Sequence, residues 1–250
     1  LKEGLVVRTT TDKVRDSRAA NMEFLLINHP LDCPICDQAG ECKLQDNAFG
    51  YGEQRSRHDE RKRQYAGYDR TMIGPHVVAD MTRCIQCTRC IRFCSEIAGT
   101  GELTFLDRGG RTLVWTHDGK PLANDWSACA ADVCPVGALT SKPFRFSART
   151  WELARRKSVS PHDGLGSSLV MQVKQERVMR VVPLENEAVN ECWLSDRDRF
   201  AYEGLNTEDR LTRPMVCVDG AWVEVSWPEA LAAVAKGLRE TVAKHGPAAL

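Results

Sequence analysis

The sequence predicts an α+β fold, and three observations support this class. Two segments have the capping residues and apolar spacing of helices, the residues after about 150 alternate as strands do, and the cysteines between them are closely spaced. The chain has 250 residues, 42% of them hydrophobic, which is enough to bury ordinary cores. Lys+Arg and Asp+Glu cancel at 34 each, so no overall field favours nucleic acid or an anionic membrane surface. No apolar run approaches the roughly 20 residues of a membrane span. We therefore expect a globular chain with protein partners, no nucleic acid and no direct membrane span.

The first predicted element is a helix over residues 12–28, with Thr11 or Asp12 as its cap. It leads directly to His29, and the prolines that follow exclude regular helix from the next stretch. This stretch should therefore be a loop around a metal site. Its potential ligands have the spacing H-x3-C-x2-C-x5-C and are His29, Cys33, Cys36 and Cys42.

A second group of cysteines begins with the spacing C-x2-C-x2-C and ends with a distant Cys-Pro. In this three-plus-one arrangement, a tight loop binds three irons of a [4Fe-4S] cluster and a remote thiolate binds the fourth. The residues are Cys84, Cys87, Cys90 and Cys134. A disulfide framework is disfavoured, because the chain is long and C-x2-C spacing is typical of thiolate coordination in a reducing compartment.

Zinc is the alternative for both groups, since it also binds four cysteines, or three cysteines and one histidine, and uses C-x2-C pairs. Zinc ligands usually come two and two, whereas both groups here are three plus one. The sequence therefore predicts two iron-sulfur clusters. A zinc-stapled interaction module remains as a hypothesis of another class.

Strand patterns follow each group of ligands. Residues 111–121, with Asp118-Gly119 at the turn, are predicted to form a hairpin between Cys90 and Cys134. Residues 169–173 and 178–182 should form a hairpin in a mostly β domain. A further hairpin is expected at residues 216–225.

The last predicted element is a helix that opens with the capping box Ser226–Glu229 and ends at Gly246-Pro247. Both ends of the chain look like cuts, so we expect further protein on either side. The predicted domains are residues 1–57 with the first ligand group, 58–148 with the second, and 149–250 with the β pattern.

Three segments closely resemble the large iron-sulfur subunit of NADH:quinone oxidoreductase, respiratory complex I. They are NHPLDCPICDQ at 28–38, MTRCIQCTRCIRF at 81–93 and DVCPVGALTSKPF at 132–144. The resemblance implies that electrons leave NADH on a neighbouring flavin subunit, pass through this chain, and continue through cluster-carrying connecting subunits towards quinone, coupled to proton translocation in the whole complex. The chain would then be an electron conduit in an oxidoreductase, with no catalytic residue or substrate site of its own.

The resemblance also implies the ligand sets. His29, Cys33, Cys36 and Cys42 match the histidine-ligated [4Fe-4S] site, whereas Cys84, Cys87, Cys90 and Cys134 match the all-cysteine [4Fe-4S] site. The family begins with a [2Fe-2S] domain that is missing here, so a [2Fe-2S] cluster is expected only in that missing part. The expected location is peripheral, on the cytoplasmic face of a bacterial inner membrane or the matrix side of a mitochondrial one.

The β domain resembles the start of molybdopterin oxidoreductases. Some relatives carry a further cluster there, but residues 159–170 contain no cysteine, so we expect neither that cluster nor molybdopterin. The competing redox hypothesis is the electron-transfer subunit of a soluble NAD-linked hydrogenase or formate dehydrogenase. Both fit the tail less well, because the former should end near the clusters and the latter should keep the missing cysteines.

For several residues near the predicted ligands, the sequence leaves more than one role possible. Arg83, Arg89 and Arg92 either stabilise the reduced second cluster or lie on the surface. Cys94 and Cys129 are expected to be inert thiols, although replacement of Cys134 by Cys129, or a smaller cluster, stays open. The isolated Cys192 and Cys217 are expected to be small buried hydrophobes.

Overall fold

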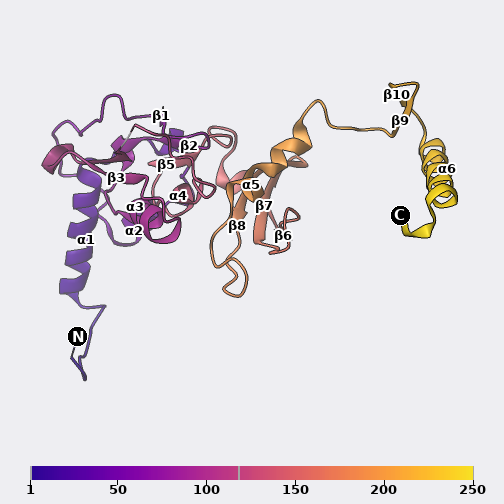
Figure 1. The fold of residues 1–250 in the computed structure, drawn as a ribbon. Helices are drawn as coiled ribbons and strands as arrows, with labels where there is room; N and C mark the ends of the chain where they lie inside the picture. Colours follow the sequence, from indigo (N-terminus) through magenta and orange to yellow (C-terminus); the bar gives the residue numbers. More distant parts are fainter. Residues whose placement is uncertain (1, 118, 250) are drawn as a thin grey trace. The chain divides into compact units, whose positions relative to one another are not determined.

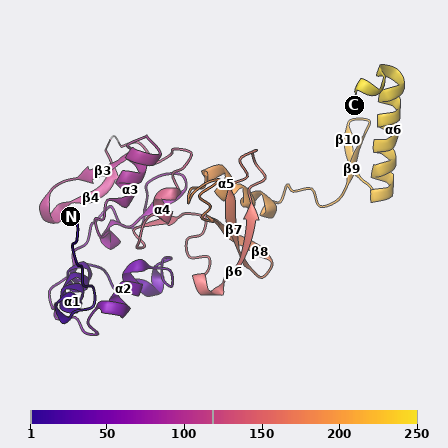
Figure 2. The ribbon, with the colours of Figure 1, turned by 90° about the horizontal axis from the view of Figure 1, so that it is seen from below.

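A computed structural model describes residues 2–117 and 119–249 and confirms the predicted α+β class. The chain divides into two compact units, Leu1–Tyr202 and Glu203–Leu250. The larger unit contains every candidate ligand, and its ribbon runs from indigo to orange in Figures 1 and 2. In the described ranges, no helix is both long and apolar enough to cross a membrane.

The first helix, α1, spans Asp12–Ile27, one residue shorter than predicted. The Thr11 hydroxyl caps it by accepting a hydrogen bond from the Val14 amide at 3.4 Å. At the other end, Lys62 Nζ donates to the carbonyls of Leu26 and Ile27 at 2.7 and 2.9 Å, and so satisfies two carbonyls that lack helical partners. These hydrogen bonds hold the C-terminal end of α1 in place, two residues before His29.

A short antiparallel sheet brings the two parts of the second ligand group together. Its strands are β1 (Thr71–Met72), β2 (Val77–Ala79) and β5 (Leu139–Ser141), in the order β1-β2-β5. Ala79 pairs with Leu139, and the Asp80 amide donates to the Ala138 carbonyl at 2.8 Å. Since Cys84 follows β2 and Cys134 precedes β5, this register places their loops side by side.

Short helices complete this region around an apolar core. They are η1 (Cys33–Ile35), α2 (Lys43–Tyr51), η2 (Met81–Arg83), α3 (Arg89–Arg92), the π-helix Phe93–Ile97, and α4 (Cys129–Asp132). Figures 1 and 2 show α1 beside α2, and α3 beside α4. Fully buried members of the core include Val77, Ala79, Met81 and Leu122. Cys42, Cys90 and Cys134 are themselves members of this core, and Cys84 packs against it.

The hairpin predicted at residues 111–121 was wrong in its pairing. Strand β4 (Leu113–Thr116) pairs with the preceding β3 (Leu103–Leu106), and the chain turns through η4 (Gly109–Arg111). The upstream strand β3 pairs apolar residues with those of β4, such as Leu106 with Leu113. A downstream strand is disfavoured, because Pro121 has no amide to donate to a strand ladder. Asp118, from the predicted turn, lies outside the described residues.

The predicted hairpin after residue 150 is confirmed, and a third strand joins it. Strand β6 (Ala154–Val159) pairs with β7 (Ser168–Lys174), which pairs with β8 (Arg177–Pro183), all antiparallel. Because β6 has the sequence ARRKSV and is mostly exposed, no apolar alternation marks it as a strand. Helical turn η5 (Thr150–Glu152) precedes this sheet, and helices α5 (Asp196–Phe200) and η6 (Ala201–Asn206) follow it.

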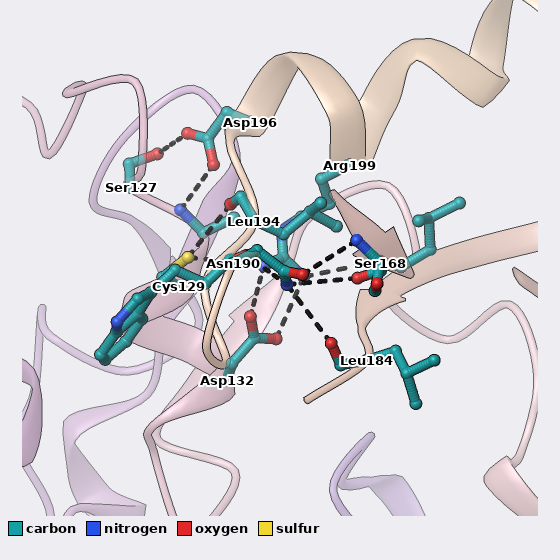
Figure 3. A network of polar contacts seen from close by, with 12 residues as sticks. Ser127, Cys129, Asp132, Ser168, Leu184, Asn190, Leu194, Asp196 and Arg199 are labelled. Carbon is teal, nitrogen blue, oxygen red and sulfur yellow. Dashed lines mark hydrogen bonds and ion pairs between the residues drawn. The ribbon is translucent and has the colours of Figure 1, made fainter. Parts of the chain in front are cut away.

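A buried polar network joins α4 to α5 (Figure 3). Asp196 accepts hydrogen bonds from Ser127 Oγ at 2.5 Å and from the Ala128 amide at 3.0 Å. Arg199, with 5% of its side chain exposed, forms an ion pair with Asp132. Since α4 ends two residues before Cys134, this network fixes the segment that carries the remote ligand.

Replacing Arg199 with Met is expected to lower the free energy of unfolding by about 3 kcal/mol, because Asp132 then keeps a poorly hydrated charge without a partner. The estimate is at the low end for a broken buried pair, since a quarter of the Asp132 side chain is exposed. The matched control is Arg197→Met, whose pair with Asp163 is largely exposed and should be worth less than about 1 kcal/mol. Urea unfolding measures both. Equal losses of unfolding free energy in the two variants would show that the buried Arg199–Asp132 pair stabilises the fold no more than the exposed pair does.

The smaller unit confirms both of its predicted elements. Strands β9 (Met215–Val218) and β10 (Ala221–Glu224) form a hairpin, with Asp219 and Gly220 at φ values of 50° and 83°. Helix α6 (Trp227–His245) begins at the Ser226 capping box, and η7 (Pro247–Ala249) follows it.

Candidate metal centres

The four cysteines of the second group line one pocket with apolar walls, which we call the second centre. Cys84 and Cys87 lie on the loop from η2 to α3, Cys90 lies in the first turn of α3, and Cys134 follows α4. Cys90 and Cys134 are buried, whereas Cys84 and Cys87 are partly buried. The other residues lining the pocket are Met81, Ile85, Thr88, Val114, Pro135, Val136, Ala138 and Leu139. The structure thus brings together the four residues that sequence spacing selected.

Electrostatics make these thiols suitable as thiolate ligands of metal cations. Burial raises the pKa of Cys90, and the neighbouring Cys134 and Cys84 raise it further. Burial likewise raises the pKa of Cys134 to about 11, although backbone hydrogen bonds with Val136 and Leu139 oppose this change. Several thiolates so close together repel one another in an apolar pocket, so a bound cation is what would stabilise them.

The backbone of the loop also suits an anionic cluster. Gln86 and Thr88 have φ values of 56° and 65°, in the left-handed region that costs non-glycine residues about 1–3 kcal/mol. At this reversal the Gln86 amide donates a hydrogen bond to Cys84 Sγ at 3.3 Å. The Gln86 side chain donates to the Thr112 carbonyl at 2.6 Å, which holds the turn in place.

We call the first predicted ligand group, His29, Cys33, Cys36 and Cys42, the first centre. Cys36 and Cys42 are buried, whereas Cys33 is exposed. Nδ1 of His29 is buried without a hydrogen-bond partner. Burial, followed by the charge of Arg83, lowers the pKa of His29 to about 4, so its imidazole is neutral at pH 7. A buried nitrogen without a partner is costly, and a bond to a metal would satisfy it.

The two centres meet at the segment that follows Cys134. A Cβ atom added at Gly137 would lie 2.1 Å from Cys36 Sγ, so only glycine leaves room for that thiol. The Pro135 carbonyl accepts hydrogen bonds from the Lys43 amide at 3.2 Å and from Cys42 Sγ at 3.6 Å. Thus one short segment follows a candidate ligand of the second centre and contacts two candidate ligands of the first.

Arg83 lies at the first centre, although it is adjacent in sequence to Cys84. Its Nε and Nη2 donate to Asp32 Oδ2 at 3.3 and 3.0 Å, and its Nε lies 3.4 Å from Asp80 Oδ2. Arg89 and Arg92 are exposed, in agreement with the surface alternative. Sequence spacing could not show that the Arg83 side chain turns away from its own loop.

The remaining cysteines lie outside the second centre. Cys129 donates to the Leu194 carbonyl at 3.1 Å and accepts from Arg199 at 3.6 Å (Figure 3). Cys94 is fully buried in the π-helix after the loop. Its inertness and that of Cys129 stay predictions. Cys192 and Cys217 are exposed, so the prediction that they are buried was wrong.

Within the described part of the chain, no three His, Cys, Asp or Glu side chains converge on a single metal ion. In a [4Fe-4S] cluster, each ligand binds a different iron, so its ligands need not converge in that way. The buried thiols, the unpartnered His29 nitrogen and the space at Gly137 fit such clusters. The role of Gly137 was not predicted from the sequence, where a glycine two residues after Cys134-Pro135 is the signal that could have indicated it.

Sequence models of four families match the chain, in the order expected from the resemblance. Their descriptions are "NADH-ubiquinone oxidoreductase-G iron-sulfur binding region" (residues 18–57), "NADH-quinone oxidoreductase subunit 3, ferredoxin-like domain" (74–140), "NADH-ubiquinone oxidoreductase NDSU1/NuoG-like, 4Fe-4S domain" (153–203) and "Molybdopterin oxidoreductase" (210–250). The third range contains one cysteine, Cys192, too few for a cluster bound by four thiolates.

Curated relatives cover nearly the whole chain. A subunit of the NADH-quinone oxidoreductase of Rickettsia conorii is 48% identical over 239 residues, which are 96% of this chain and 35% of that protein. NADH dehydrogenase [ubiquinone] iron-sulfur protein 1 of Solanum tuberosum is 47% identical over 95% of this chain and 32% of its own length. The chain thus spans about a third of these relatives. Among solved structures, a chain of an NAD+-reducing [NiFe]-hydrogenase is 26% identical with a TM-score of 0.47, covering 59% of this chain and 63% of that one.

Proposed function

The chain belongs to the family of the large iron-sulfur subunit of NADH-quinone oxidoreductase, and from this premise we propose that it conducts electrons through two [4Fe-4S] clusters towards quinone. The electrons would enter from a flavin subunit that oxidises NADH and leave to cluster-carrying connecting subunits, with proton translocation in the whole complex. One observation carries the proposal: Pro135 and Gly137 join the two candidate centres by direct contacts. Adjacent redox centres are what electron conduction requires.

Bound at these centres, [4Fe-4S] clusters would supply one-electron redox chemistry. Cys84, Cys87, Cys90 and Cys134 would hold the second cluster, and the Gln86 amide would stabilise its negative charge. His29, Cys33, Cys36 and Cys42 would hold the first. A neutral imidazole in place of one thiolate makes that centre less negative, which favours its reduction.

Further parts of the proposal follow from the family. The partners would be the flavin subunit and the connecting subunits, and the location would be peripheral, on the cytoplasmic or matrix side of an energy-converting membrane. Any [2Fe-2S] cluster would belong to another part of the full protein, and we propose no molybdopterin. We keep residues 1–57, 58–148 and 149–250 as the proposed domains.

The alternatives have less support. The matches at residues 153–203 and 210–250 continue well beyond the two ligand groups, whereas a hydrogenase electron-transfer subunit was expected to end near them. The shortage of cysteines at 153–203 disfavours a formate dehydrogenase. Zinc as a structural metal would leave the contact between the centres without a redox role.

Electron conduction is tested in the complex purified with its partner subunits. Addition of NADH should reduce both [4Fe-4S] clusters, as seen in low-temperature EPR of rapidly frozen samples. Quinone added afterwards should oxidise both clusters again. If both signals respond to dithionite but not to NADH within turnover, the clusters exist but do not lie on the electron path.

His29→Cys is expected to leave a cluster at the first centre but to lower its reduction potential, because an anionic thiolate replaces a neutral imidazole. A redox titration followed by EPR measures the shift, with the second centre as the internal control. An unchanged or raised potential would contradict the proposed ligand role of His29.

A further inference from the structure

Arg83 is next to a cysteine of the second centre in sequence, but its side chain lies beside the first centre. It immediately precedes Cys84, yet its Cδ lies 3.6 Å from the position of a Cβ at Gly137, where Cys36 Sγ is 2.1 Å away. Only 7% of its side chain is exposed. A permanently charged guanidinium is therefore buried beside a candidate ligand of the first centre, where solvent screens it little.

Two carboxylates from separate segments hold this guanidinium. Asp32 lies between His29 and Cys33 and accepts two hydrogen bonds from Arg83, whereas Asp80 follows β2 and is 3.4 Å away. Burying an ion pair costs desolvation energy, and apolar residues would tie two loops together at least as well. The charge itself therefore requires an explanation beyond packing.

We propose that Arg83 raises the reduction potential of the first centre selectively, and that Asp32 positions Arg83 and moderates its effect. This inference rests on the proposed function, since it assumes a cluster at the first centre. A nearby positive charge stabilises the more negative reduced state, and a nearby negative charge opposes this. Arg83 is thus a positioning and tuning residue, not a ligand.

The effect on the potential of the first centre is selective because Arg83 and Arg89 lie in different environments. Arg83 is buried against Cys36, and its charge also acts on His29, whose pKa it helps to lower. Arg89 lies within the second loop and is exposed, so water and salt screen its charge. Of these two arginines, Arg83 should therefore have the larger effect on potential, and it should act on the centre that is not its neighbour in sequence.

The test uses the full-length protein, purified anaerobically with the subunits that remain bound. EPR-monitored redox titrations give both potentials, and the signal that shifts in His29→Cys identifies the first centre. Arg83→Gln should lower the ratio of reduced to oxidised first centre at a fixed potential about tenfold, equivalent to 59 mV for one electron. The second centre should shift less. Arg83→Lys should restore most of the ratio, because it keeps the charge.

Two further variants separate tuning from simple structural support. Asp32→Asn should shift the first centre in the opposite direction, to a higher potential, whereas Arg89→Gln should leave both potentials unchanged. A structural role alone would not give opposite signs for the two partners of one ion pair. If Arg83→Gln assembles no first cluster, the sign for Asp32→Asn decides: a raised potential supports the inference, and an unchanged or lowered one overturns it.

Failure of the inference can be told from failure of the proposed function. If the unmodified protein contains no iron-sulfur clusters, the proposed function itself is wrong. If both clusters are present and Arg83→Gln shifts the first centre no more than Arg89→Gln does, the proposed function stands and the role of Arg83 is refuted.

Discussion

Replacing Cys134 with Ala is expected to abolish the reducible [4Fe-4S] signal of the second centre and to leave that of the first. Cys134 lines the pocket with Cys84, Cys87 and Cys90, and the pocket lining contains no further cysteine that could replace it. The nearest replacement in sequence, Cys129, is held elsewhere by the Leu194 carbonyl and Arg199 (Figure 3). Iron and sulfide analysis together with EPR measures the loss.

The matched control is Cys129→Ala, another buried cysteine only five residues away. This variant should keep both signals, with at most a loss of stability from the hydrogen bonds it removes. The opposite pattern, in which Cys129→Ala abolishes the signal and Cys134→Ala keeps it, would show that Cys129 is the fourth ligand.

The second large effect is expected from Gly137→Ala, which adds a single methyl group at a buried position. Its Cβ would lie 2.1 Å from Cys36 Sγ, far inside contact distance, so the thiol or the backbone must move. Overpacking of this kind typically costs about 1–3 kcal/mol. Because Cys36 is a proposed ligand, we expect loss of the first [4Fe-4S] signal or its conversion to a form with fewer irons.

Gly110→Ala provides the control for this change. Gly110 also has no positive φ value, but a Cβ there would meet nothing within 4 Å. This variant should keep both clusters. If Gly137→Ala retains an unaltered first centre by EPR, Cys36 does not need the space at Gly137, and the direct contact between the centres is not a constraint on cluster binding.

Local signals in the sequence predicted those elements that are determined locally. The Thr11 cap and the Ser226 capping box mark their helices because each satisfies helix amides within the next turn. Asp219-Gly220 marks its hairpin because the turn needs two residues with positive φ. Cysteine spacing selected the four side chains that meet at the second centre for the same reason: three of them lie close together in sequence, between residues 84 and 90.

Features that depend on distant partners could not be predicted in this way. Strand β4 had two possible neighbours, and the turn signal after it favoured the wrong one. Strand β6 has no apolar pattern that could indicate a strand. It forms by backbone pairing with β7, which its side chains do not reveal. The placement of Arg83 at the first centre depends on Asp32, 51 residues away. Only the folded chain shows such contacts.

The central claim is that this chain holds two iron-sulfur clusters, and metal analysis tests it most directly. The measurement is the content of iron, acid-labile sulfide and zinc in anaerobically purified protein, with low-temperature EPR after dithionite reduction. We predict about eight irons and eight sulfides for these two centres, with two reducible [4Fe-4S] signals that Cys134→Ala and Gly137→Ala remove separately. Two zinc ions and no sulfide would contradict the account and identify a zinc-stapled module.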